Sequence, residues 1–176
     1  MNIDMLAGKN VGLRSLQEND LSILKDWRNS ENIRKTTREY RLLNMINQKD
    51  WFNNLHLSIP PKDIMFGIIK RNKLIGVTGL TYIDWKNKHA EISIYLTLKN
   101  WQKTKEVKET IEIIKKYAFG ELNLHRLWVE VFAIATENRA LFKRMKFQEE
   151  GILKDKLWRK GMWWDSVIYS IISPDN

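Results

Sequence analysis

Glu91, Ser93 and Tyr95 alternate along one predicted strand, so their side chains share one face of a sheet. A carboxylate can accept a proton and a phenol can donate one, which makes Glu91 and Tyr95 a candidate base and a candidate acid. Glu91 could act directly or through a water molecule. The alternative is that Glu91 is an ordinary solvent-facing carboxylate of a strand, and the sequence leaves both interpretations open.

A second candidate group lies in the arginine-rich segment 34–41, which contains Arg38, Tyr40 and Arg41. Guanidinium groups bind phosphates through paired hydrogen bonds, so these residues would suit a phosphorylated ligand. The formal charge of +9 also favours anionic partners, although its sign does not choose among phosphates, nucleotides and nucleic acid. Ordinary surface charge explains the same arginines almost as well.

The composition excludes several kinds of site. There is no cysteine, which excludes a disulfide framework, a thiol nucleophile and a zinc site with sulfur ligands, and three scattered histidines make a poor metal cluster. We therefore expect no metal site. No run near the N-terminus has the length of a signal peptide, and no segment approaches the roughly 20 apolar residues of a membrane helix. These features predict a soluble, cytoplasmic protein that does not bind membranes.

The elements that must position these residues follow from the hydrophobic pattern. With 176 residues and 43% hydrophobic content, the chain is expected to form one domain over residues 1–176. Helical spacing predicts helices near 21–27, 46–55, 104–120 and 136–145, and alternation predicts strands near 11–16, 65–70, 74–82, 90–98, 126–132, 147–153 and 163–172. This order implies an α/β fold, a mixed and mostly antiparallel sheet with helices on both faces.

Several segments in this order resemble the GNAT superfamily of N-acetyltransferases. Within it they are similar to the branch of ribosomal-protein N-terminal, polyamine and amino-sugar-nucleotide acetyltransferases. The resemblance covers nearly the whole chain, and its order and spacing are a strong signal for the fold. It rests on Trp27-Arg28-Asn29, Ile33-Arg34, Gly76-Val-Thr-Gly79-Leu, strand 91–98, Leu122-Asn-Leu-His-Arg126, Ala140-Leu-Phe-Lys-Arg-Met-Lys-Phe147-Gln-Glu-Glu-Gly151 and Lys160-Gly-Met-Trp-Trp-Asp165.

The resemblance implies acetyl-CoA as the cofactor, with its pyrophosphate at a helix start, where unpaired N–H groups and the helix dipole favour anions. The usual Q/R-x-x-G-x-G/A motif reads here Trp101-Gln-Lys-Thr104-Lys-Glu106, so Thr104 and Glu106 replace small residues. Glu106 would repel a pyrophosphate, and Lys103 and Lys105 would partly offset it. The cofactor residues implied by the resemblance are Leu96, Leu98, Gln102, Lys103, Thr104, Lys105, Glu106, Val107, Asn138 and Phe142.

The resemblance also implies which groups handle protons. Many members use a tyrosine on the helix after the fifth strand to protonate the thiolate that leaves, and Phe142 takes its place here. The asparagine that usually starts this helix falls at Ala135, with Asn138 as the alternative. Tyr95 is then the best substitute acid and Glu91 the candidate base, and backbone N–H groups of 94–98 would polarise the thioester. Segment 34–41 would shape the acceptor site.

We therefore predict an N-acetyltransferase that moves an acetyl group from acetyl-CoA to a primary amine, and the arginine-rich segment favours an amino-sugar nucleotide over a protein N-terminus as the acceptor. A polyamine is disfavoured near so many cations unless the acceptor cleft is locally acidic. The alternative is a catalytically impaired GNAT-fold binding module or altered scaffold, because Thr104, Glu106, Ala135 and Phe142 all depart from the family pattern. A nucleic-acid-binding domain rests only on charge and aromatic content and is disfavoured. Trp163 and Trp164 near the C-terminus are expected to be exposed and could mark a homodimer interface.

Overall fold

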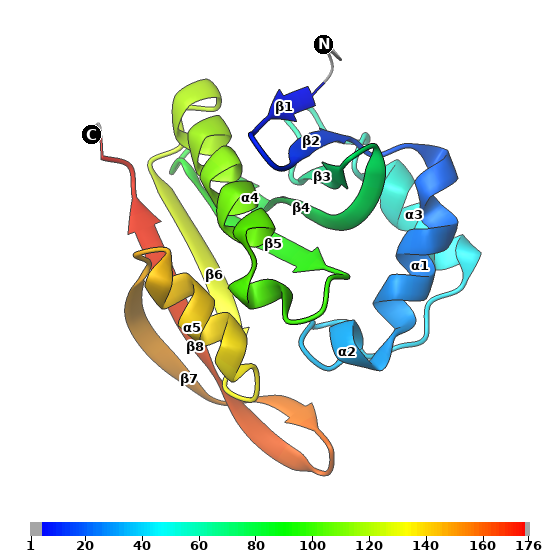
Figure 1. The fold of residues 1–176 in the computed structure, drawn as a ribbon. Helices are drawn as coiled ribbons and strands as arrows, with labels where there is room; N and C mark the ends of the chain where they lie inside the picture. Colours follow the sequence, from blue (N-terminus) through cyan, green and yellow to red (C-terminus); the bar gives the residue numbers. More distant parts are fainter. Residues whose placement is uncertain (1–4, 175–176) are drawn as a thin grey trace.

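A mixed eight-stranded sheet runs through residues 5–174, the part of the chain that the computed structural model describes (Figure 1). The strand order is β1-β2-β3-β4-β5-β6-β8-β7, and every neighbouring pair is antiparallel except β5 and β6, which are parallel. The predicted α/β fold with a mostly antiparallel sheet is confirmed. The strands are β1 (Met5–Ala7), β2 (Gly12–Ser15), β3 (Ile64–Lys70), β4 (Lys73–Asp84), β5 (His89–Leu96), β6 (Arg126–Phe132), β7 (Gln148–Arg159) and β8 (Met162–Ile172).

Helices cover both faces of this sheet, as alternate residues of β5 show. Ile92 and Leu96 pack in the larger core cluster with residues of α4, whereas Tyr95 packs with Leu24 of α1 and Ile33 of α2. Successive strand residues point to opposite faces, so the two clusters lie on opposite sides of β5. The helices are α1 (Leu21–Asn29), α2 (Glu31–Arg34), α3 (Met45–Asn54), α4 (Lys105–Lys116) and α5 (Thr136–Arg144), with short turns η1 (Glu18–Asp20), η2 (Trp101–Lys103) and η3 (Tyr117–Glu121).

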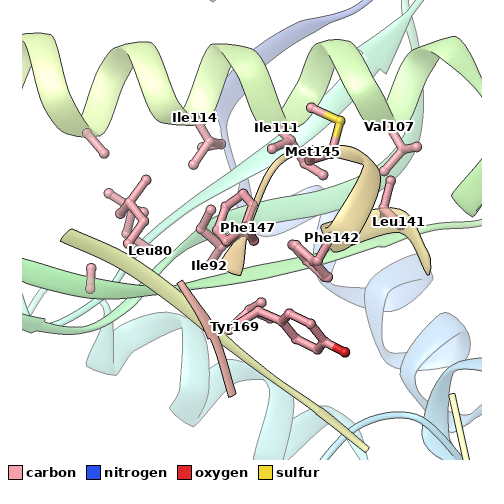
Figure 2. Close-up of a cluster of buried hydrophobic side chains, with 14 of the residues drawn as sticks. Leu80, Ile92, Val107, Ile111, Ile114, Leu141, Phe142, Met145, Phe147 and Tyr169 are labelled. Carbon is pink, nitrogen blue, oxygen red and sulfur yellow. The ribbon is translucent and has the colours of Figure 1, made fainter. Parts of the chain in front are cut away.

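The larger core lies where α4 and α5 pack on the sheet (Figure 2). Its members on α4 recur at helical spacing, and three of them, Val107, Ile111 and Ile114, are fully buried. Phe142 of α5 contacts Phe147 edge to face, with ring centroids 5.3 Å apart. This packing holds α4 and α5 in place on the sheet. Because α4 follows β5, α5 follows β6 and the two strands are parallel, both helices begin near the carboxyl ends of these strands.

The sequence missed two short elements and one long extension. β1 has three residues and α2 has four, and neither is long enough to show a period. β7 continues to Arg159 instead of ending near residue 153, because its second half pairs with β8 while most of its side chains remain exposed. A strand exposed on both faces lacks the alternation that predicts strands. The β7–β8 hairpin projects beyond the rest of the sheet (Figure 1).

The two tryptophans near the C-terminus differ in exposure. Trp163 is 58% exposed, whereas Trp164 is partly buried and its indole N–H donates to the carbonyl of Arg159 at 3.1 Å. The expectation that both are exposed is wrong for Trp164. A homodimer interface at this hairpin stays a prediction and would have to use Trp163.

Two kinds of feature are absent from residues 5–174. No helix there has the length and apolar character needed to span a membrane. In the same range, no three or more His, Cys, Asp or Glu side chains are grouped so that they could hold a metal ion.

Candidate active site

The site begins where two parallel strands separate. β5 and β6 pair only over His89–Glu91 and Arg126–Trp128, after which the strands diverge. A cavity of about 370 Å³, here called the fork cavity, lies between the separated strands and is lined by residues 91–95 of β5 and 129–132 of β6. A second cavity of about 670 Å³, the helix-start cavity, is lined by residues 96–102 and 134–138. The walls of both include Thr36, Trp101 and Asn138, so the two cavities adjoin.

Glu91 lies at the point of separation and is buried, with 4% of its surface exposed. Arg38 donates from Nη1 to Oε2 of Glu91 at 2.8 Å and from Nη2 to Oε1 at 2.6 Å. The backbone N–H of Glu130 on β6, beyond the last paired residue, donates to the same Oε1 at 3.3 Å. The carboxylate thus binds a backbone group that the diverging strand leaves unpaired. Glu91 is not the solvent-facing residue of the alternative interpretation.

Arg38 links the two strands through a second carboxylate. Its Nη2 also donates to Oε2 of Glu130 at 2.7 Å, and the hydroxyl of Ser166 on β8 donates to Oε1 at 2.6 Å. Burial opposes both charges, but the hydrogen bonds raise the pKa of Arg38 above its usual value, and Ser166 and Arg38 hold the pKa of Glu130 below its usual value. Glu91, Arg38 and Glu130 therefore form a charged network with one excess negative charge.

The fork cavity is locally acidic although the chain carries a formal charge of +9. Its charged lining residues are two cations and four carboxylates: Arg28, Arg38, Glu39, Asp63, Glu91 and Glu130. The sequence disfavoured a cationic amine unless the acceptor cleft is locally acidic. The fork cavity meets this condition.

Tyr95 lines the fork cavity from the same strand face as Glu91. Its ring contacts Trp27 of α1 edge to face, with centroids 6.5 Å apart. Burial raises the pKa of its phenol, and the positive charge of Arg28 acts in the opposite direction without cancelling the rise. The phenol therefore stays protonated near neutral pH, which a proton donor requires.

The three predicted acceptor residues are not together. Arg38 lines the fork cavity, whereas Tyr40 is 67% exposed and lines neither cavity. Arg41 donates from Nε and Nη2 to the two oxygens of Glu39 at 2.9 and 2.8 Å. Since the guanidinium groups of Arg38 and Arg41 are both paired with glutamates, they give little reason to expect a phosphate at this place.

The start of α4 is capped by its own side chains. Thr104 is the N-cap residue, and its hydroxyl accepts from the N–H of Val107 at 3.4 Å and donates to the carbonyl of Trp101 at 2.8 Å. Val107 itself has a fully buried side chain in the core. The hydroxyl of Thr104 is therefore already engaged with the backbone of the turn where the resemblance implies a pyrophosphate.

Glu106 does not face outward from the helix start. Its side chain is buried and accepts from Nζ of Lys70 on β3 at 2.7 Å, an interaction that lowers the pKa of its carboxyl. The charge that we expected to repel a pyrophosphate is thus compensated by a lysine 36 residues earlier in the chain. Lys99 and Lys105 are exposed near this turn, and the helix start therefore remains suited to an anion.

The other predicted cofactor residues lie along the helix-start cavity or near it. Leu96, Leu98 and Gln102 line it, and Asn138 lies in the walls of both cavities. Contacts between η2 and α5 cross this region: Nε2 of Gln102 donates to Oδ1 of Asn138 at 2.8 Å, and Lys103 lies 3.2 Å from Oε1 of Glu137. A long ligand that occupies both cavities must pass beside these contacts.

Phe142 is almost fully buried and lies among the core side chains beneath α4 (Figure 2). It also lines the fork cavity. It offers no proton to a ligand. Of the two residues considered for the proton donor, only Tyr95 carries a hydroxyl, and it lines the fork cavity from β5.

The variant Glu106→Gln tests whether the carboxylate of Glu106 repels a pyrophosphate at the start of α4 or is neutralised by Lys70. A folded-state pKa below the ordinary 4.5 contributes stability above pH 4.5 that is lost as the pH falls, so wild type should lose more stability on acidification than Glu106→Gln. Urea unfolding at about pH 7 and about pH 4 measures this difference. The variant should tighten acetyl-CoA binding by no more than about threefold, because Lys70 already compensates the charge. A gain of about tenfold or more would show that Glu106 does repel the ligand.

Sequence reasoning missed three residues of the fork cavity or its surroundings. Glu130 alternates with apolar residues on β6, and Ser166 is a small polar residue of β8, so neither stands out without the three-dimensional pairing. Arg28 belongs to the motif Trp27-Arg28-Asn29, but its spacing does not indicate a cavity. The burial of Ser166 opposite Glu130 appears only when β6 and β8 are paired in register.

The chain is similar in sequence to known N-acetyltransferases. A family model described as acetyltransferase (GNAT) domain matches residues 13–168. The chain is 30% identical over 115 residues to an uncharacterized N-acetyltransferase, YoaA, of Bacillus subtilis, a match that covers 64% of each chain. It is 25% identical over 173 residues to an uncharacterized N-acetyltransferase, p20, of Bacillus licheniformis, which covers 97% of each.

Solved structures show the same fold. A spermidine N-acetyltransferase from Vibrio cholerae, in complex with CoA and spermine, superposes with a TM-score of 0.84 at 23% identity, over 94% of this chain and 96% of that one. RimL, a ribosomal L7/L12 alpha-N-protein acetyltransferase in complex with coenzyme A, gives a TM-score of 0.84 at 18% identity, over 96% and 97%.

Proposed function

The chain belongs to the GNAT family of acetyl-CoA-dependent N-acetyltransferases, and we propose that its acceptor is a primary amine bound in the fork cavity. The observation that carries the proposal is the separation of β5 from β6 directly after Glu91, which places a charged network and a buried phenol around one cavity. The adjoining helix-start cavity leads to an anion-compatible helix start and would hold the cofactor.

Acetyl-CoA supplies the thioester whose acetyl group is transferred. The residues of β5 beyond Glu91 pair with β4 on one side only, so the N–H groups that face β6 have no strand partner. Such fixed donors polarise a carbonyl and stabilise the charge that develops on its oxygen. This supports transfer in a ternary complex, with the amine approaching from the fork cavity.

Proton transfers follow from the same residues. The network of Glu91, Arg38 and Glu130 has an excess negative charge and attracts the acceptor as an ammonium ion. Because both oxygens of Glu91 are bound by Arg38, this carboxylate takes the amine's proton through a water molecule rather than by direct contact. The phenol of Tyr95 protonates the thiolate that leaves.

Which groups the acceptor can carry beside its amine depends on the charged side chains of the cavity that are not already paired. Of the two similar solved structures, one is a spermidine N-acetyltransferase and the other a ribosomal-protein acetyltransferase, and both acceptors bear amines. An acidic fork cavity supports a cationic amine. An amino-sugar nucleotide remains a proposed acceptor, but Arg38 and Arg41 are paired, so another cation must bind its phosphates.

Calorimetric titration with acetyl-CoA tests the function. We expect a micromolar dissociation constant, equivalent to about −8 kcal/mol, and thiol release that depends on added primary amine. The impaired binding module is the second candidate, favoured by the self-capped start of α4, and it predicts no binding at millimolar acetyl-CoA. Binding without amine-dependent thiol release would reject the acceptor chemistry while keeping the cofactor site.

A further inference from the structure

Arg28 is a charged residue of the fork cavity for which the described part of the chain supplies no partner. It lies on α1 and lines the cavity. Its Nε is buried without a hydrogen-bond acceptor, and no carboxylate within residues 5–174 forms an ion pair with it. A buried donor without an acceptor is costly. The two Nη groups of Arg28 are not buried and also have no partner within residues 5–174, so they are the donors that an occupant of the cavity can reach.

Three of the four carboxylates that line the fork cavity are already bound by arginines other than Arg28, and the fourth, Asp63, accepts from the backbone N–H of Tyr82. Glu39 accepts from Nε, Nη2 and the backbone N–H of Arg41, and Glu91 and Glu130 accept from Arg38. The charge of Arg28 nevertheless acts on groups of the site: Arg41 is the main cause of the lowered pKa of Glu39 and Arg28 adds to it, and Arg28 opposes the rise that burial causes in the pKa of Tyr95. Arg28 and the candidate acid Tyr95 both line the fork cavity.

We propose that Arg28 binds an anionic group, a carboxylate or a phosphate, that the acceptor carries beside its primary amine. The inference rests on the proposed function and extends it. Guanidinium groups favour oxyanions because their donors match two oxygens at once. The cavity then has an acidic side for the ammonium, at Glu91 and Glu130, and a basic side for the anion. Amino acids and phosphorylated amines fit this division, whereas a diamine leaves Arg28 unpaired.

The experiment uses matched acceptors that differ only in the anionic group. L-Lysine and cadaverine differ by a carboxylate, and phosphoethanolamine and ethanolamine differ by a phosphate. Thiol release from acetyl-CoA gives kcat/KM for each compound. We expect the anionic member of at least one pair to be favoured by about ten- to a hundredfold, the range of a charge-assisted hydrogen-bonded pair. The pair that shows the preference identifies which oxyanion is recognised.

Variants separate binding of the anion from other effects. Arg28→Gln should abolish the preference by lowering kcat/KM for the compound that carries the anionic group, without lowering it for the matched amine that lacks this group. Arg28→Lys should restore part of the preference. Arg34→Gln is the matched control, because Nε of Arg34 is also buried without an acceptor but the residue lines neither cavity. Calorimetry should show equal acetyl-CoA affinity in all four proteins.

The outcomes are distinct. If acetyl-CoA does not bind wild type, the proposed function fails before Arg28 is at issue. If acetyl-CoA binds and the paired compounds react equally, or Arg28→Gln keeps the preference, the role of Arg28 is wrong. If no compound reacts, L-lysine and phosphoethanolamine are titrated into the protein with CoA bound. Binding of one that Arg28→Gln removes supports the proposal, and binding of neither overturns it.

Discussion

Arg38→Met should lower the free energy of unfolding by about 2 kcal/mol at neutral pH. Breaking a buried ion pair by removing one partner costs roughly 3–5 kcal/mol, and the value is reduced here because the side chain of Arg38 is 43% exposed. The variant leaves Glu91 and Glu130 charged, buried and close to each other without a cation between them. Urea unfolding monitored by tryptophan fluorescence measures the change.

The pH dependence of this loss identifies its cause. In wild type, the lowered pKa of Glu130 contributes stability above the ordinary carboxyl pKa of 4.5 that is lost as the pH falls. Without Arg38, repulsion between the two carboxylates favours protonation of one of them. Protonation removes this repulsion, so the variant regains stability relative to wild type as the pH falls. The difference between the two proteins should narrow toward about pH 4.5. A difference independent of pH would mean that lost packing, not lost charge, is responsible.

Two further variants complete this test. Adding Glu91→Gln to Arg38→Met should recover part of the stability, because only one buried charge then remains. Arg41→Met is the matched control, since the side chain of Arg41 is 61% exposed and its pair with Glu39 should contribute no measurable stability. Equal losses at Arg38 and Arg41 would contradict the special role of the network.

The sequence predicted the elements of the site better than their contacts. Strand alternation correctly placed Glu91 and Tyr95 on one face of β5, because a period of two follows from strand geometry alone. The partner of Glu91 is Arg38, 53 residues away in a segment without a period, and nothing local indicates that pairing. The same limit applies to Glu106, whose charge looked unfavourable until Lys70 was found beside it.

The arginines illustrate why charge patterns mislead. A cluster of Arg38 and Arg41 suggested phosphate recognition, yet each is bound by a glutamate in the folded protein. Arg28 belongs to the motif Trp27-Arg28-Asn29, but nothing in the sequence indicated that it lines the cavity without a partner among residues 5–174. Whether a charge is available for a ligand depends on tertiary pairing, which composition cannot report.

Tyr95→Phe should lower kcat by about a hundredfold, the lower part of the range for losing a general acid or base. The reason is that Phe142 cannot donate a proton, and Tyr95 is the remaining predicted acid at the cavity. The KM for acetyl-CoA should change little, because the hydroxyl acts after the cofactor is bound. Thiol release at saturating acetyl-CoA and acceptor measures kcat.

Stability separates this role from a structural one. Within residues 5–174, no hydrogen bond is recorded for the Tyr95 hydroxyl, so its removal should leave the free energy of unfolding within about 1 kcal/mol of wild type. Because burial raises the pKa of the phenol, it stays protonated, and the ratio of wild-type to variant rates should be constant from about pH 6 to about pH 9. Tyr40→Phe, at an exposed tyrosine outside both cavities, is the control. An unchanged kcat in Tyr95→Phe would leave water as the donor, and Tyr95 would then be a core residue that happens to line the cavity.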